Sequence, residues 1–191
     1  AQTAASDALE TVNGLSVGGV NLIDNSDAYH LVATGADSFW LAADELEPDT
    51  DYTLSVKEVV LEAGSAAGVT WKLVNRNTGT AHASGTLDFT YGRQVRHFKV
   101  PSTSGNWELH LYAGISGSTT GVTVQFNKVK LEEGTMATSW SASPDDSKNA
   151  MVQIADTIED LDADMEERIR TLIDSLGLSE QFASVSDFLD A

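Results

Sequence analysis

The side chains that most often carry catalysis are present in this sequence, but they do not form known catalytic motifs. The histidines His30, His82, His97 and His110 are scattered, and no zinc-binding spacing links them. The serines lack a Gly-x-Ser-x-Gly elbow, and the glycine-rich segment 114–117 lacks the lysine of a phosphate loop. We therefore expect a protein that is not an enzyme. A carboxylate pair for glycoside hydrolysis stays open, because any acid-rich sequence contains candidates.

Binding chemistry is better represented, on the outward faces of predicted strands. If Trp107, Leu109 and Leu111 face a core, then His110 and Tyr112 lie on the opposite face. Proteins bind sugar rings with aromatic faces and with amide, imidazole and charged hydrogen-bonding groups. The candidate carbohydrate-binding residues are therefore Lys72, His97, His110, Tyr112 and Gln125, with Tyr91 and Arg93 at the rim. An ordinary solvated outer face would give the same pattern, so both interpretations stay open.

The overall composition narrows the class of protein. The 191 residues include 11 Lys and Arg against 29 Asp and Glu, a net charge of −18 that opposes binding to nucleic acid. Because there is no cysteine, disulfides and thiolate metal sites are excluded. No apolar run approaches the ~20 residues of a membrane span, and no signal segment opens the chain. The chain begins without Met, inside a helix-like stretch, so we expect it to be part of a longer polypeptide.

Hydrophobic periodicity divides the chain into three parts. Residues 1–18 are predicted to hold a short helix, Ala1–Val12, and a linker, and residues 144–191 are predicted to be helical again. Between them, residues 19–143 show period-two alternation broken by short turns, which favours antiparallel strands. The predicted strands are Tyr29–Thr34, Ser38–Ala43, Tyr52–Glu62, Val69–Arg76, Ala81–Phe89, Gln94–Val100, Trp107–Ile115 and Val122–Leu131. The fold class is therefore mainly β: an antiparallel β-sandwich, expected to be a jelly roll.

A strong helix start follows the sandwich. Ser143 is suited to cap a helix, Pro144 suits its first position, and Asp145 and Asp146 favour the positive end of its dipole. The predicted helix runs over 32 residues, Asp145–Leu176, or roughly 48 Å, and Gly177 is expected to end it. A short amphipathic helix, Ser179–Leu189, is predicted after it.

The long helix carries one apolar stripe with coiled-coil spacing. The stripe consists of Met151, Ile154, Ile158, Leu161, Met165, Ile169, Leu172 and Leu176, in steps of three and four residues. From Pro144 onward, 13 acidic residues stand against three basic ones, so the remaining surface is acidic. We predict that the stripe mediates self-association. The alternative is a lone amphipathic helix that packs on its own sandwich.

Three segments resemble a known family. They are 21–26 (NLIDNS), 46–55 (LEPDTDYTLS) and 129–140 (VKLEEGTMATSW), the last followed by 143–146 (SPDD). Together they resemble the carbohydrate-binding-module-like jelly rolls of bacteriophage tail-fibre and minor structural proteins. We interpret Pro48, Asp49 and Tyr52 as a corner that fixes strand entry, and Trp140 as packing at the joint between sandwich and helix, its indole N–H bound to a carbonyl.

The resemblance carries functional expectations. It implies a virion protein of a tail or fibre, assembled with other virion proteins, that displays a domain for a host cell-surface glycan. Because tail fibres are usually trimers, it also implies a homotrimer. Jelly rolls of this kind often tie their chain ends with calcium, and Asn21, Asp24, Asn127 and Glu132 are oxygen donors near those ends.

Two alternatives from other classes stay open. One is an extracellular carbohydrate-binding accessory module of a secreted bacterial glycosidase or adhesin. The long acidic helix argues against it, because such modules are usually connected to the rest of their protein by flexible linkers. The other is a purely architectural fibre domain without a ligand.

Overall fold

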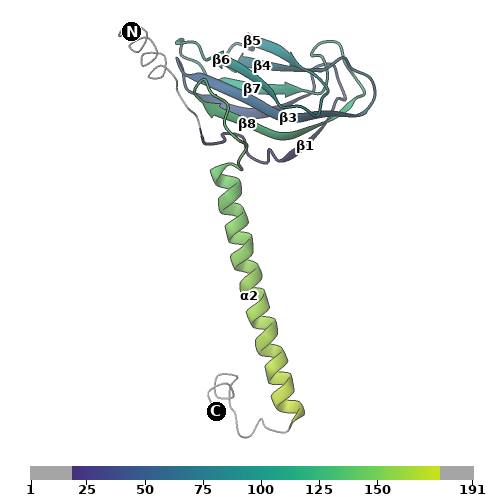
Figure 1. Ribbon diagram of the computed structural model, residues 1–191, viewed down its shortest axis with the longest axis vertical. Coiled ribbons are helices and arrows are strands. Elements are labelled where there is room, and N and C mark those ends of the chain that lie inside the picture. The colour runs from purple at the N-terminus through teal and green to yellow at the C-terminus, as the bar shows by residue number, and fades with distance from the viewer. Residues whose placement is uncertain (1–18, 177–191) are drawn as a thin grey trace, which may run out of the picture. The chain divides into compact units, whose positions relative to one another are not determined.

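A computed structural model describes residues 19–176 (Figure 1). The chain divides into two compact units, one ending at Asp146 and the other beginning at Ser147. The predicted helices Ala1–Val12 and Ser179–Leu189, and the predicted stop at Gly177, lie outside the described residues. Within those residues, no helix combines the length and apolarity needed to cross a membrane.

The first unit is a β-sandwich of two four-stranded antiparallel sheets (Figure 1). One sheet has the order β1 (Ala28–Val32), β8 (Thr123–Glu133), β3 (Asp51–Ala63) and β6 (Gln94–Lys99). The other has the order β2 (Phe39–Leu46), β7 (Trp107–Tyr112), β4 (Val69–Asn75) and β5 (Thr80–Leu87). Each predicted strand overlaps one observed strand, so the predicted β-sandwich is confirmed.

The strand pairing is nested. β1 pairs with β8, β2 with β7, β3 with β6 and β4 with β5, all antiparallel. This is the pairing of one long hairpin rolled into two facing sheets, which is the arrangement of a jelly roll. The core between the sheets is formed by inward residues of both, among them Leu54, Val56, Leu73, Leu109, Leu111, Val124, Phe126 and Leu131.

The predicted alternation of buried and exposed residues holds for one strand and fails for another. In the first half of β8, Val124 and Phe126 are buried while Gln125 is half-buried, as expected. In β7, by contrast, every residue is buried, so the prediction of a solvent-exposed face on this strand is wrong. The reason is that β7 lies between β2 and β4, whose large side chains cover its outer face.

The predicted corner before β3 is confirmed in its geometry. Asp49 adopts a positive φ of 59°, and the backbone N–H of Glu47 donates to Tyr52 Oη at 3.0 Å. The buried Tyr52 thereby anchors the turn from inside the sandwich.

The end of the sandwich is also built as predicted. Trp140 Nε1 donates to the carbonyl of Val129 at 3.1 Å, and the N–H of Asp146 donates to Ser143 Oγ at 3.0 Å. The second contact is the predicted N-cap, and it begins helix α2 (Pro144–Ser175).

Helix α2 carries the predicted apolar stripe, and two further large apolar residues lie outside it: Val152, which is exposed, and Ile173, which is buried. Seven of its members, Met151, Ile154, Ile158, Leu161, Met165, Leu172 and Leu176, are 50–73% exposed in the single chain, and Ile169 is half-buried. Leu176 follows the last helical residue directly. The helix itself is therefore confirmed, and its self-association stays a prediction.

Candidate functional site

The outer face of the β2–β7–β4–β5 sheet carries an aromatic cluster. The ring of Phe39 stacks on the imidazole of His110 with centroids 4.0 Å apart and planes within 8°. Phe39 also contacts Tyr112, with centroids 5.5 Å apart. We call these three residues the aromatic platform. His110 and Tyr112 are 6% and 7% exposed, whereas Phe39 is 43% exposed, so Phe39 presents the platform to solvent.

Strand register explains why these side chains meet. Phe39 lies opposite Tyr112 in the β2–β7 pair, and Leu41 lies opposite His110. Phe39 and Tyr112 are therefore cross-strand neighbours on one face, and His110 is two residues from Tyr112 on that same face. On the other side of β7, Lys72 of β4 lies opposite His110.

Polar and charged groups surround the platform. His110 Nε2 lies 2.8 Å from Glu108 Oε2, and Arg76 Nε lies 3.4 Å from the second oxygen of the same carboxylate. Lys72 Nζ lies 4.8 Å from the centre of the Tyr112 ring, a cation–π contact. These groups supply charged donors and an acceptor beside an aromatic surface.

The same lysine begins a chain of hydrogen bonds at one side of the platform. Lys72 Nζ donates to Ser116 Oγ at 2.6 Å, and Ser116 Oγ donates to Asp37 Oδ1 at 2.8 Å. Burial raises the pKa of Tyr112, with a further contribution from the Asp37 carboxylate, while a hydrogen bond with Ser116 opposes the shift. The phenol of Tyr112 therefore stays protonated at neutral pH and remains a hydrogen-bond donor.

The structure brings together only part of the predicted carbohydrate-binding set. Lys72, His110 and Tyr112 lie on one outer face, but the prediction that His110 and Tyr112 are exposed there is wrong. His97 and Gln125 belong to strands β6 and β8 of the other sheet, and Nδ1 of His97 lies 2.9 Å from Thr53 Oγ1.

The two rim residues also lie away from the platform. Tyr91 and Arg93 precede β6, in the sheet that does not carry the platform, and Tyr91 is 82% exposed. Arg93 donates to Ser55 Oγ and to the carbonyl of Thr138. The predicted set therefore does not form a single site.

Phe39 is a member of the aromatic platform that the sequence analysis did not single out. Its signal was present, because the alternation of Phe39, Trp40 and Leu41 places Phe39 and Leu41 on the face opposite the buried Trp40. What the alternation did not reveal is that Phe39 covers the imidazole of a neighbouring strand.

The oxygen donors predicted to bind calcium are engaged in other ways or lie apart. The side chain of Asn21 is buried and exchanges hydrogen bonds with Ser26 and with backbone groups of Val129 and Leu131. Asn127 donates to Glu58, and Asp24 is exposed. Among the described residues, no three His, Cys, Asp or Glu side chains are grouped to hold a metal ion.

At the fourth donor, Glu132, a lysine provides the positive charge. Lys130 Nζ lies 3.2 Å from Glu132 Oε2, and both side chains are fully buried. The same ammonium donates to the carbonyls of Gly19 and Ser139, at 2.9 and 3.0 Å, and to Thr138 Oγ1 at 2.5 Å. Lys130 thus joins the two ends of the sandwich, the task that the sequence interpretation gave to calcium. We call this arrangement the Lys130 clasp.

Comparisons with known proteins give distant structural similarities. No family model and no curated protein matches the sequence. The chain is similar to the BppUct-A-L tripod from the baseplate of bacteriophage Tuc2009, with 16% identity, TM-score 0.44, and 69% of this chain and 60% of that chain covered. It thus spans about 60% of the tripod chain.

The chain is also similar to carbohydrate-binding modules. One is described as a CBM4, with 14% identity, TM-score 0.36, and 62% of this chain and 76% of that chain covered. Another is CBM1 of BiXyn10A, with 18% identity, TM-score 0.34, and 64% of this chain and 93% of that chain covered. These similarities concern the arrangement of the chain and assign it no ligand.

Proposed function

We propose that this chain is a bacteriophage virion protein, from a tail fibre or a minor structural component, whose β-sandwich binds a host cell-surface glycan. In this proposal α2 assembles the chain into a homotrimer, and the role is binding without catalysis. The resemblance of segments 21–26, 46–55 and 129–140 to phage jelly-roll domains supports the virion assignment.

The observation that carries the glycan proposal is the half-exposed ring of Phe39 on buried His110, beside hydrogen-bonding groups. The C–H face of a sugar packs on an aromatic ring, while its hydroxyls need both donors and acceptors. Lys72 and Arg76 are donors, and Glu108 and Asp37 are acceptors. Because these groups are tied together by the contacts described above, little side-chain freedom is lost on binding.

The apolar stripe of α2 supports the homotrimer. More than half of the surface of most stripe residues is exposed in the single chain, and their spacing matches that of knobs fitting into the holes of identical helices. A single shallow site on a sandwich binds weakly, so several copies on one stalk would gain avidity on a repeating polysaccharide.

A binding assay tests the glycan proposal. Cell-wall polysaccharide is immobilised, and the retention of the intact chain is compared with that of Phe39→Ala. We expect the variant to lose at least about tenfold in affinity, because truncating the exposed ring of the aromatic platform removes its stacking surface. The control is Val32→Ala, an exposed apolar position on an edge strand of the other sheet, which should bind like the parent.

Two results would count against this site. If Phe39→Ala is retained as well as the parent, the platform is not the binding surface. If the parent itself is not retained by any of a broad set of bacterial polysaccharides while the oligomer is intact, the domain is fibre architecture.

Light scattering tests the assembly. The parent should show three times the chain mass of 20.3 kDa. Ile158→Asp places charges together in the apolar seam and should give monomers with a folded sandwich. Val152→Asp makes the same change at an exposed position outside the stripe and should leave the trimer intact. A monomeric parent would overturn the assembly, and another multiple would overturn the trimer.

A further inference from the structure

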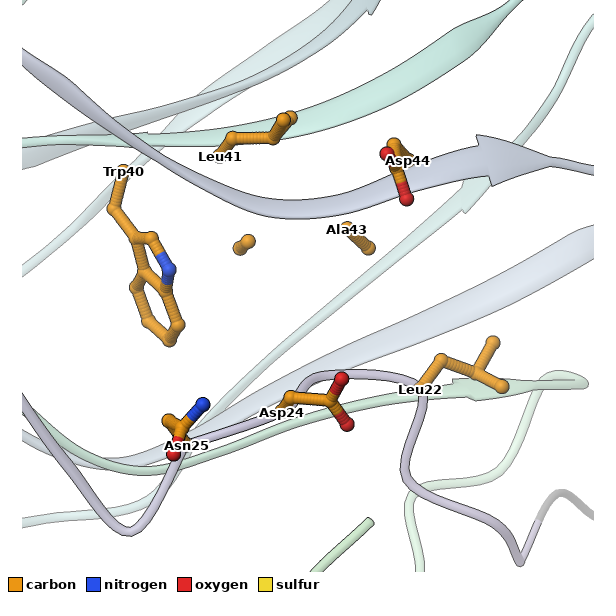
Figure 2. Close-up of a pocket in the computed structure, with 8 residues that line it drawn as sticks. Leu22, Asp24, Asn25, Trp40, Leu41, Ala43 and Asp44 are labelled. Carbon is orange, nitrogen blue, oxygen red and sulfur yellow. The ribbon is translucent and has the colours of Figure 1, made fainter. Parts of the chain in front are cut away.

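A cavity at the edge of the sandwich is lined by none of the three residues of the aromatic platform. Its volume is about 280 Å³, and it lies between strand β2 and the segment that precedes β1 (Figure 2). Asp44, Leu41 and Trp40 come from β2, and Asp24 and Asn25 come from the facing segment. We call it the edge pocket. The two aspartates stand on opposite walls in Figure 2, so a ligand between them would meet both.

Trp40 is the feature that points to a ligand. The side chain is 8% exposed and is fixed by stacking on Tyr29, with ring centroids 4.0 Å apart. Its indole N–H has no hydrogen-bond partner among residues 19–176, and Figure 2 shows the nitrogen turned toward the space between the two walls. The nitrogen is open to the cavity and is not a fully buried unpaired donor, so either water or a ligand in the cavity can accept from it. An acceptor on a bound ligand would satisfy it.

The charges of the edge pocket select the kind of ligand. Asp24 and Asp44 form no hydrogen bond or ion pair within the described part of the chain, and no basic side chain lines the cavity. Carboxylates only accept hydrogen bonds, so a ligand must present donors to both walls, and a positively charged donor is favoured over a neutral one. An anionic ligand would be repelled by both aspartates and by the net charge of −18.

Apolar groups complete the cavity. Leu22 and Leu41 are partly exposed at its edge, and Trp40 offers the side of an indole ring. Such a lining suits the C–H groups of a small ring, and the cavity is close to the lower end of the ~300–1,000 Å³ range of ligand pockets. We propose that the edge pocket binds one amino-sugar unit with a free ammonium group, held by Asp24 and Asp44, with one ring or hydroxyl oxygen accepting from Trp40.

This site is separate from the aromatic platform, so the two are tested independently. Glucosamine is titrated into the intact chain, and the four tryptophan indole N–H signals are followed by NMR, with Trp40→Phe used to assign the relevant one. We expect glucosamine to shift the Trp40 signal and glucose to bind at least about tenfold more weakly, because it lacks the charge.

Variants that keep the shape of a side chain but remove its charge show which carboxylates recognise the ammonium group of glucosamine. Asp44→Asn and Asp24→Asn should each weaken glucosamine binding by about tenfold or more, with little change in glucose binding. Glu45→Gln removes a neighbouring exposed carboxylate that does not line the cavity and should bind like the parent. Phe39→Ala should also bind glucosamine like the parent, even if it no longer binds polysaccharide.

Three results would overturn the proposal. Equal binding of glucose and glucosamine would show that the pocket does not recognise the ammonium group. Unchanged binding in Asp44→Asn and Asp24→Asn would place the ligand elsewhere. A Trp40 signal that responds to calcium chloride and not to glucosamine would identify the edge pocket as a cation site instead.

Discussion

Replacing Lys130 with methionine should strongly destabilise the sandwich. The substitution keeps the length and apolar stem of the side chain and removes only its charged end. It leaves the fully buried Glu132 carboxylate without its counter-charge, and it leaves the carbonyls of Gly19 and Ser139 without this donor. The carboxylate retains its two hydrogen bonds from Thr138, at 2.8 and 2.5 Å, which compensate only in part.

The magnitude follows from burial. Removing one partner of a buried ion pair costs about 3–5 kcal/mol, because the other charge stays buried without compensation. An exposed pair in the same protein is the matched control. Lys99 Nζ lies 2.9 Å from Asp49 Oδ1, closer than Lys130 to Glu132, but the two side chains are 53% and 70% exposed. Lys99→Met should therefore lower the free energy of unfolding far less than Lys130→Met, because solvent screens an exposed pair.

Urea unfolding followed by tryptophan fluorescence measures both variants, because Trp40, Trp71 and Trp107 are buried in the sandwich. The double variant Lys130→Met/Glu132→Leu should be more stable than Lys130→Met alone, since it removes the orphaned charge as well. Two results would show that the Lys130 clasp does not hold the chain ends. One is that Lys130→Met lowers the free energy of unfolding no more than Lys99→Met. The other is that the double variant loses as much free energy of unfolding as Lys130→Met and Glu132→Leu lose together.

Two further predictions concern pH and salt. Burial raises the pKa of Tyr52 above its ordinary value of 10.0, with the carboxylates of Glu133 and Glu47 adding to the shift and a hydrogen bond from the Glu47 backbone opposing it. The stability that this shift represents is present below pH 10 and is lost as pH rises through the folded-state pKa. The free energy of unfolding should therefore fall between about pH 9 and 12. In Tyr52→Phe this fall should be less steep, because the titrating phenol is absent. Salt or mild acid should raise the thermal midpoint of α2 in the oligomer by relieving repulsion between acidic residues of neighbouring helices, and a midpoint that falls from low to moderate salt would contradict this.

The sequence predicted what depends on local pattern. Alternation located the strands, and the Ser143 cap with the following acids located the start of α2, because both signals are set by neighbours along the chain. The corner at Tyr52 and the hydrogen bond from the Trp140 indole to a carbonyl were also predicted from the sequence.

What the sequence did not predict depends on contacts across strands. Alternation assigned His110 to a solvent-exposed face, but Phe39 from β2 covers it. A lysine at position 130 is expected at the surface from the sequence alone, but both ends of the sandwich bury it. The edge pocket likewise joins Asp24 and Asp44 from segments that no local pattern pairs.

The central claim is that α2 presents several copies of a glycan-binding sandwich to one surface. The most direct test is the rate at which the protein leaves immobilised host cell-wall polysaccharide, measured for the parent and for Ile158→Asp. If each sandwich binds weakly and the stalk links several of them, then avidity should make the parent dissociate about 10²-fold or more slowly than the monomeric variant. Equal dissociation rates for a trimeric parent and a monomeric variant would contradict the account.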